Sequence, residues 1–260
     1  LEGGESTIVA MDELIRVACS LGVAEILIGM ARTNDPAEER PEITAFIVER
    51  GAEGFTTEYR CDFMGLKGLN NGLLRFENVF VPKENIVLGV GKGLSLALRT
   101  LNTGRLTLPA ACGGAMKQGL AMARHWANER RQWGAAIGRH EAVAAKVAAM
   151  ATDIYAVDSL TWLTSAMADR GTQDIRLETA MAKLFCSEAL WRTADAAVPV
   201  RGGRGYETAQ SLAGRGELPM PMERLLRDAR INLIIEGTSE IMRLFIAREA
   251  LDPHLKVAGA

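Results

Sequence analysis

The feature that most constrains the fold is a change of sequence pattern near residue 93. Before it, short apolar runs rich in β-branched residues alternate with turn-forming residues, as strands do. After it, apolar residues recur at helical spacing over long, alanine-rich stretches. Long helices with small faces pack closely side by side. The pattern therefore predicts an α+β protein, with a small antiparallel β domain followed by an antiparallel four-helix-type bundle.

The same pattern predicts individual elements. Strands are expected at residues 24–30, 43–48, 55–59 and 73–81, with Pro82 ending the last one. Helices are expected at residues 93–129, 140–169, 174–198 and 238–251, with a weak point near Pro109 and an end at Asp252-Pro253. One face of the second helix should be buried, and it carries Ala144, Val147, Ala148, Ala151 and Ile154.

These elements divide the sequence into three predicted parts. They are a divergent N-terminal segment at residues 1–21, a partial β domain at residues 22–90, and a C-terminal helical bundle domain at residues 91–260.

Composition narrows the class of protein. Of 260 residues, 48% are hydrophobic and 24% are charged, which is typical of a soluble globular chain. A net charge of −2 gives no electrostatic reason to bind nucleic acid, and no apolar run reaches the roughly 18 residues of a membrane span. The first residues lack the basic and apolar regions of a signal peptide. Four scattered cysteines and three histidines argue against a metal site and favour a reduced, cytoplasmic compartment.

The stretch Glu236-Gly237-Thr238 is the strongest candidate for a catalytic site. It follows the apolar run 231–235, and Gly237 allows the backbone to bend sharply and approach a ligand. Apolar surroundings raise the pKa of a carboxyl group and make it a better base near neutral pH. The alternative is that Glu236 is a helix cap or a partner of the helix dipole.

Two further segments suggest contacts with a cofactor. Arg130-Arg131-Gln132-Trp133-Gly134 offers guanidinium donors for phosphate oxygens and an indole that can pack on a planar ring, although a solvated basic loop is the alternative. Gly202, Gly203 and Gly205 permit close backbone approach, although their spacing excludes a dinucleotide-binding Rossmann loop and a helix C-cap is the alternative.

An arginine within the first long helix needs a partner if it is buried. Arg105 lies in the segment Leu101–Arg105, among apolar residues. A buried guanidinium requires an anionic or hydrogen-bonding partner, whereas a surface arginine does not. Arg105 is therefore a conditional candidate for the same site.

Taken in order, these motifs resemble the acyl-CoA dehydrogenase family. The resemblance is carried by five segments along residues 22–250, namely Phe76–Pro82, Asn102–Arg105, Arg131–Gly134, Gly202–Tyr206 and Glu236–Thr238. It implies that Glu236 is the catalytic base and that Arg105 and Gly237 bind substrate. It also implies that FAD is bound by a further set of residues, which are Ser20, Arg131, Trp133, Gly202, Gly203 and Thr238.

The resemblance is incomplete at the N-terminal side. The family has an N-terminal helical domain that finds no match in this sequence. Its Trp-x-Thr/Ser strand beside the flavin is matched only by Ala18-Cys19-Ser20, where Ser20 keeps a hydroxyl but the aromatic ring is missing.

The resemblance implies FAD-dependent α,β-dehydrogenation of an acyl-CoA thioester, as in fatty acid beta-oxidation. Glu236 would take the α-proton while a hydride passes to the flavin. The expected partners are acyl-CoA, an electron-transfer flavoprotein and further copies of the chain in a homodimer or homotetramer. The alternatives are a flavin oxidase or monooxygenase on the same fold, and a non-catalytic truncated scaffold that needs a partner chain.

Overall fold

A computed structural model describes residues 16–18, 24–34 and 38–258. The chain divides into two compact units, Leu1–Thr100 and Leu101–Ala260, and each is described by itself. The predicted flavin contact Ser20 lies outside the described residues.

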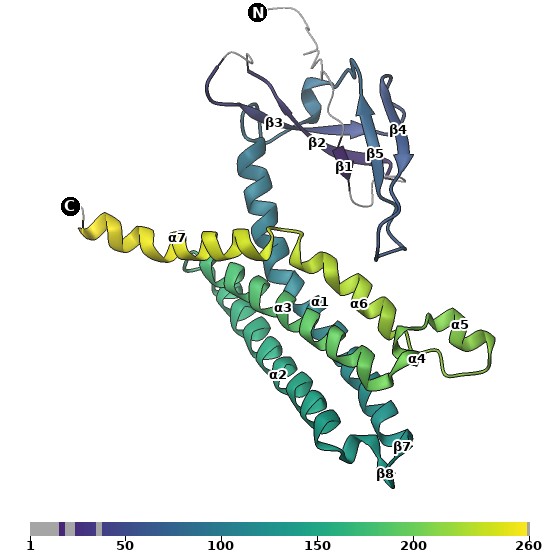
Figure 1. The fold of residues 1–260 in the computed structure, drawn as a ribbon. Coiled ribbons are helices and arrows are strands. Elements are labelled where there is room, and N and C mark those ends of the chain that lie inside the picture. Colours follow the sequence, from purple (N-terminus) through teal and green to yellow (C-terminus); the bar gives the residue numbers. More distant parts are fainter. Residues whose placement is uncertain (1–15, 19–23, 35–37, 259–260) are drawn as a thin grey trace, which may run out of the picture. The chain divides into compact units, whose positions relative to one another are not determined.

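The first unit contains two antiparallel sheets of three strands each. One has the order β1-β5-β4, with strands Arg16–Ala18, Gly72–Phe76 and Phe55–Arg60. The other has the order β2-β3-β6, with strands Ile26–Arg32, Ile43–Glu49 and Ile86–Val87 (Figure 1). Side chains of both sheets and of the segment after β5 build one apolar core, which consists of Leu27, Ala31, Phe46, Val48, Leu74, Phe76, Val79 and Val81.

The strand expected at residues 73–81 is shorter than predicted. β5 ends at Phe76, and Asn78 adopts a left-handed backbone with φ 51°. Asparagine tolerates this conformation better than most residues, and it ends the extended run. Val79 and Val81 remain buried, so the apolar pattern marked the core correctly while the turn within it was missed.

The second unit is a helical bundle. Its main helices are α1 (Gly93–Glu129, which begins before the unit boundary), α2 (Glu141–Arg170), α3 (Arg176–Arg201), the shorter α6 (Met222–Arg230) and α7 (Ser239–Ala258). Figure 1 shows α1, α2, α3 and α6 running alongside one another, with α7 crossing them. Side chains of these four helices share one core, made of Leu108, Cys112, Met116, Ile154, Val157, Cys186, Ala189, Leu190, Ala194 and Ala229. The predicted α+β fold with a helical bundle is confirmed.

Short elements connect the long helices, and most of them were not predicted. A hairpin of β7 (Arg131–Gln132) and β8 (Ala135–Ala136) follows α1. Two short helices, α4 (Gly203–Tyr206) and α5 (Ala209–Gly214), follow α3. A 3-10 helix, Ile231–Leu233, links α6 to the turn that precedes α7. None of the helices in the described ranges is both long enough and apolar enough to span a membrane.

Two prolines interrupt the helices less than expected. α1 continues through Pro109, and α7 continues past Asp252 to Ala258, so the predicted end at Leu251 is wrong. A proline removes one N–H donor and crowds the preceding turn, at a cost of about 3 kcal/mol. In α1, burial of Leu108 and Cys112 on either side of Pro109 offsets this cost.

The α2 face that was predicted to be buried is only partly so, because Ile154 lies in the main core and Val147 is half-buried, whereas the three alanines are exposed. Its alanines line a surface pocket of about 490 Å³ together with residues of α1, and the ones concerned are Ala144, Ala148 and Ala151. The buried side chains of α2 are larger and include Met150, Ile154 and Val157. Side chains with more apolar surface gain more from burial, which explains why they occupy the core.

Candidate active site

Glu236 and Gly237 form a tight turn between the 3-10 helix and α7. Both have positive φ values, 57° at Glu236 and 107° at Gly237. A Cβ atom at position 237 would collide with the Cε atom of Met242, which is completely buried. Position 237 therefore requires glycine, as the sequence predicted, while Glu236 adopts a conformation that costs energy for a residue with a side chain.

Thr238, not Glu236, caps α7. The Thr238 hydroxyl accepts a hydrogen bond from the backbone N–H of Ile241 at 3.3 Å, and its carbonyl accepts one from Met242 at 2.8 Å. This is the usual arrangement of an N-cap. The capping role that was one alternative for Glu236 is therefore filled by Thr238.

Arg105 reaches the same turn from α1. Its side chain is 9% exposed, and its Nε atom donates to the backbone carbonyl of Glu236 at 3.2 Å. The guanidinium also lies over the ring of Phe245, 5.1 Å from its centroid. The structure thus supplies the partner that a buried arginine needs, and it is a carbonyl oxygen.

Gly104 makes room for the Glu236 carboxylate. A Cβ atom at position 104 would collide with Oε1 of Glu236. Sequence reasoning did not single out this glycine, although a signal existed. Glycine within a helix costs about 1 kcal/mol relative to alanine, so each glycine inside α1 is a candidate for a packing or functional role.

Lys183 is a second residue that sequence reasoning missed. Its side chain is completely buried in α3, and its Nζ atom donates to the carbonyl of Gly237 at 2.7 Å. The available signal was its helical spacing from Thr179 and Cys186, which are also buried. A lysine on the buried stripe of a helix requires a partner.

Burial sets the electrostatics of this group. It raises the pKa of the Glu236 carboxyl above its ordinary value, while the positive charges of Arg105 and Lys183 oppose the rise. The Glu236 Oε2 atom is buried and has no hydrogen-bond partner among the described residues. The turn therefore holds a partly desolvated carboxylate with one oxygen free to accept a proton, as a general base requires.

A second group of predicted residues lines a pocket elsewhere in the bundle. The pocket has a volume of about 670 Å³, and its lining includes Arg130, Gln132, Trp133, Gly202 and Gly203. Arg131, the predicted phosphate contact, is exposed on β7 and is not among the lining residues.

Features of this second pocket suit a charged, planar ligand. Trp133 is 85% exposed at its edge, and Gly202 ends α3 with φ 68°. Arg201 is 3% exposed, and its Nε atom has no hydrogen-bond partner among the described residues. An exposed indole beside several guanidinium groups offers both a stacking surface and donors for anionic oxygens.

The two groups lie far apart. Arg105 and Glu129 are 24 residues apart on one helix, α1, which corresponds to roughly 36 Å at 1.5 Å per residue. The Glu236 turn and the Trp133 pocket are therefore separate sites within the bundle.

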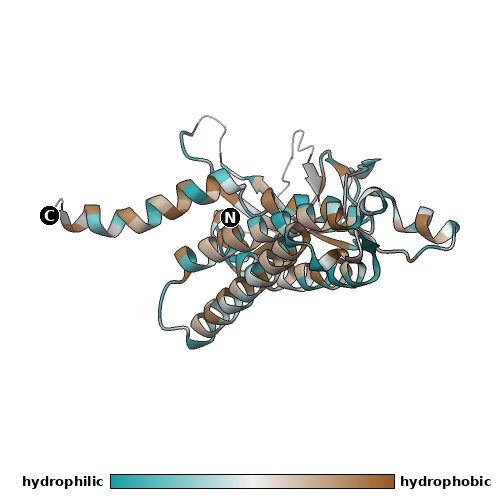
Figure 2. Cartoon of the chain, turned by 60° about the horizontal axis from the view of Figure 1, so that its bottom comes forward, coloured by the Kyte–Doolittle hydropathy of each residue, from teal (hydrophilic) through white to brown (hydrophobic). Residues whose placement is uncertain are grey.

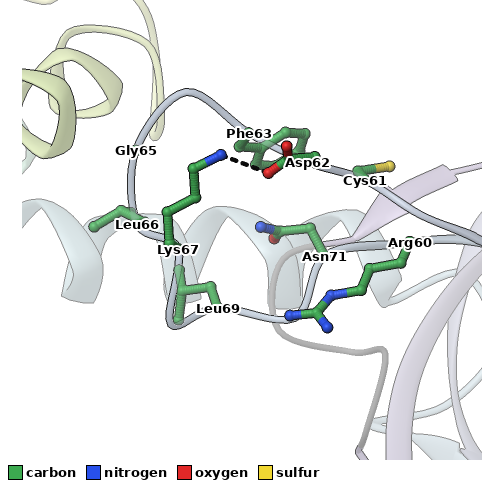
Figure 3. A pocket seen from close by; sticks show the side chains of 9 residues that line it. All are labelled: Arg60, Cys61, Asp62, Phe63, Gly65, Leu66, Lys67, Leu69 and Asn71. Atoms are coloured by element: carbon green, nitrogen blue, oxygen red, sulfur yellow. Dashed lines mark hydrogen bonds and ion pairs between the residues drawn. The ribbon is translucent and has the colours of Figure 1, made fainter.

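A third pocket lies in the first unit and contains none of the predicted residues. It has a volume of about 240 Å³ and is lined by the loop that joins β4 to β5. Figure 3 shows Lys67 reaching across this loop to pair with Asp62. The hydrogen bond and charge of Lys67 lower the pKa of the Asp62 carboxyl, so both charges are used within the loop itself.

Comparison with known proteins identifies the family. Residues 91–251 match the model of the acyl-CoA dehydrogenase C-terminal domain. A Mycobacterium tuberculosis protein named probable acyl-CoA dehydrogenase FadE10 is 52% identical over 237 residues, which are 91% of this chain and 36% of that protein. The human mitochondrial very long-chain specific acyl-CoA dehydrogenase is 37% identical over 243 residues, or 92% of this chain and 36% of that protein. The chain belongs to the acyl-CoA dehydrogenase family.

Solved structures agree with this assignment. The Bacillus anthracis acyl-CoA dehydrogenase complexed with FAD superposes with a TM-score of 0.78 at 30% identity, covering 90% of this chain and 41% of that one. The chain spans about a third of the length of the curated relatives named above, 36% in each case.

The raised pKa of Glu236 predicts how stability depends on pH. The folded protein binds this proton more tightly than the unfolded chain, whose glutamate has the ordinary value of 4.5. Stability should therefore fall as the pH rises from below 4.5 through the raised value. Glu236→Gln escapes this loss, so the variant should be more stable than the wild type at about pH 8 and equally stable below about pH 4.

Urea unfolding midpoints of both proteins across this pH range provide the measurement. A variant that is less stable than the wild type at neutral pH would mean that Arg105 and Lys183 outweigh the burial of the carboxylate.

Proposed function

We propose that this chain carries the base and the substrate-side residues of an FAD-dependent acyl-CoA dehydrogenase that acts in fatty acid oxidation. The observation that carries the proposal is the Glu236 carboxylate, whose Oε2 atom is buried without a partner in a turn held by Arg105. The family assignment and the space that Gly104 leaves for this carboxylate support the same function.

Proton abstraction from the α-carbon of an acyl thioester needs a base and a way to hold negative charge on the thioester oxygen. Glu236 takes the α-proton through its free carboxylate oxygen. Partial burial favours this transfer, because removing water raises the basicity of the carboxylate. The resemblance implies that the backbone N–H of Glu236 donates to the thioester oxygen. Arg105 orients this peptide by binding the Glu236 carbonyl.

The residues around the Trp133 pocket fit a flavin dinucleotide. Arg130 and Gln132 supply donors for phosphate oxygens, the buried Arg201 has an unpaired Nε atom, and Trp133 offers an aromatic face. Gly202 and Gly203 have open space where a Cβ atom would stand, which permits close approach of a ligand to the backbone. FAD, when bound, supplies the acceptor for the hydride that leaves the β-carbon.

The separation of the two sites supports a homo-oligomer. Roughly 36 Å of α1 lies between them. The Trp133 pocket would then hold the diphosphate end of a flavin that belongs to another copy of the chain. Figure 2 shows hydrophobic and hydrophilic segments alternating along the ribbon of α7. Its exposed apolar residues recur at helical spacing and include Ile241, Leu244, Leu251 and Leu255. An exposed apolar face of this kind is typical of an interface.

The direct test is flavin bleaching with a panel of acyl-CoA thioesters under anaerobic conditions, in the presence of added FAD. The wild type should bleach, and Glu236→Gln should retain FAD but lose bleaching by at least about a thousandfold, because the amide cannot accept the proton. Full bleaching by the variant would contradict the assignment of the base.

The electron acceptor separates the remaining alternatives. Reduction of an electron-transfer flavoprotein supports a dehydrogenase, whereas rapid oxygen consumption with acyl-CoA supports an oxidase or monooxygenase. A purified protein that binds no flavin at all would support the non-catalytic scaffold.

Gly104→Ala tests the space beside the base. The added methyl group displaces the Glu236 carboxylate, while alanine is the better helix former at this position of α1. We expect bleaching to slow by roughly a hundredfold with no loss of thermal stability, because a misplaced reacting group costs about that much. Gly114→Ala is the matched control, since a Cβ atom at this exposed position of α1 meets nothing within 4 Å. Equal activities of the two variants would argue against the role of Gly104.

Arg130→Ala and Arg131→Ala test which guanidinium contacts the flavin phosphates. Only Arg130 lines the pocket, so its loss should weaken FAD binding roughly tenfold to a hundredfold, as expected for a charge-assisted hydrogen bond. Arg131→Ala should bind FAD as well as the wild type. Flavin fluorescence titration of the apoprotein measures both, and the opposite order would restore Arg131 as the phosphate contact.

A further inference from the structure

Lys183 occupies a position that is costly for a lysine. Its side chain has no solvent exposure, and it lies in the middle of α3 near the buried residues Cys186 and Ser187. Burying an ammonium group is unfavourable unless the structure supplies strong partners. The partner here is the carbonyl of Gly237, 2.7 Å from Nζ, in a segment that follows Lys183 by 54 residues.

The bond from Lys183 completes a clamp on the turn. Arg105 of α1 binds the carbonyl of Glu236, and Lys183 of α3 binds the next carbonyl, that of Gly237. Glu236 and Gly237, whose carbonyls accept these bonds, both have positive φ values. For Glu236 this conformation is unfavourable, because it has a Cβ atom that glycine lacks. Two helices of the bundle therefore fix consecutive peptide groups of a backbone that would otherwise relax.

The charge of Lys183 also acts on the carboxylate. Lys183 and Glu236 attract each other, which lowers the pKa of the Glu236 carboxyl against the effect of burial. The other charged or titratable groups that influence the ammonium are Arg105 and Cys112 of α1 and Glu188 of α3. Removal of Lys183 would thus change both the shape of the turn and the charge beside the base.

We propose that Lys183 is a positioning residue for the base, which holds the Glu236–Gly237 turn through the Gly237 carbonyl and keeps the Glu236 carboxylate aimed at the space beside Gly104. The proposal rests on the proposed function of Glu236 and extends it to a residue that touches neither substrate nor cofactor.

Three variants separate the two contributions of Lys183. Lys183→Met removes the donor and the charge, Lys183→Gln keeps a donor without the charge, and Lys146→Met is the control on the exposed surface of α2. Lys183→Met should lower kcat at least about tenfold with little change in KM, and move the acidic limb of the kcat profile to higher pH. Lys183→Gln should recover part of kcat but keep the displaced pH profile, and Lys146→Met should match the wild type.

A titration of the Glu236 carboxyl carbon by NMR tests the inference without any activity. The protein is labelled with ¹³C-glutamate, and the signal is assigned by its loss in Glu236→Gln. Its midpoint should move to higher pH in both Lys183 variants. If Lys183→Met fails to fold, Lys183→Gln decides the outcome. An unchanged midpoint together with an unchanged kcat would overturn the proposal, whereas a displaced midpoint in a protein that never bleaches flavin would overturn only the proposed function.

Discussion

The geometry of the site depends on one short turn whose peptide groups are bound by cations from two different helices. Arg105 and Lys183 hold the carbonyls of Glu236 and Gly237, and the distance between α1 and α3 fixes where these bonds can form. That distance is set in turn by small, completely buried residues such as Cys186 and Ala189. The packing of the bundle thereby fixes the direction in which the Glu236 carboxylate points, because close-packed interiors deform little.

Arg105 and Lys183 bind backbone carbonyls, and this explains why the Glu236 carboxylate remains free to accept a proton. Had either cation bound the carboxylate oxygens directly, the resulting ion pair would have stabilised the charged form and weakened the base. Both cations bind backbone oxygens instead, and Oε2 of Glu236 keeps its lone pairs free. The positive charges still act on Glu236 from a short distance, so they limit the rise of its pKa without occupying its oxygens.

Features that depend on neighbouring residues in the sequence were predicted correctly, whereas those that depend on distant residues were missed. Helical periodicity gave the bundle, and the pairing of a carboxylate with Gly237 located the turn. The contributions of Gly104 and Lys183 were missed because each depends on a residue more than 50 positions away in the sequence. The short helices α4–α6 lacked the repeated apolar spacing that marks longer ones. Arg130 lines the pocket and the neighbouring Arg131 does not, a difference in side-chain direction that the order of residues does not reveal.

Trp133 gives the protein a built-in optical reporter. Its indole is 85% exposed at the edge of the pocket. An indole in water emits at longer wavelength than a buried one, and a flavin beside it absorbs that emission. In the proposed arrangement, a flavin in the pocket would quench the emission of Trp133 and so report its own binding without a label.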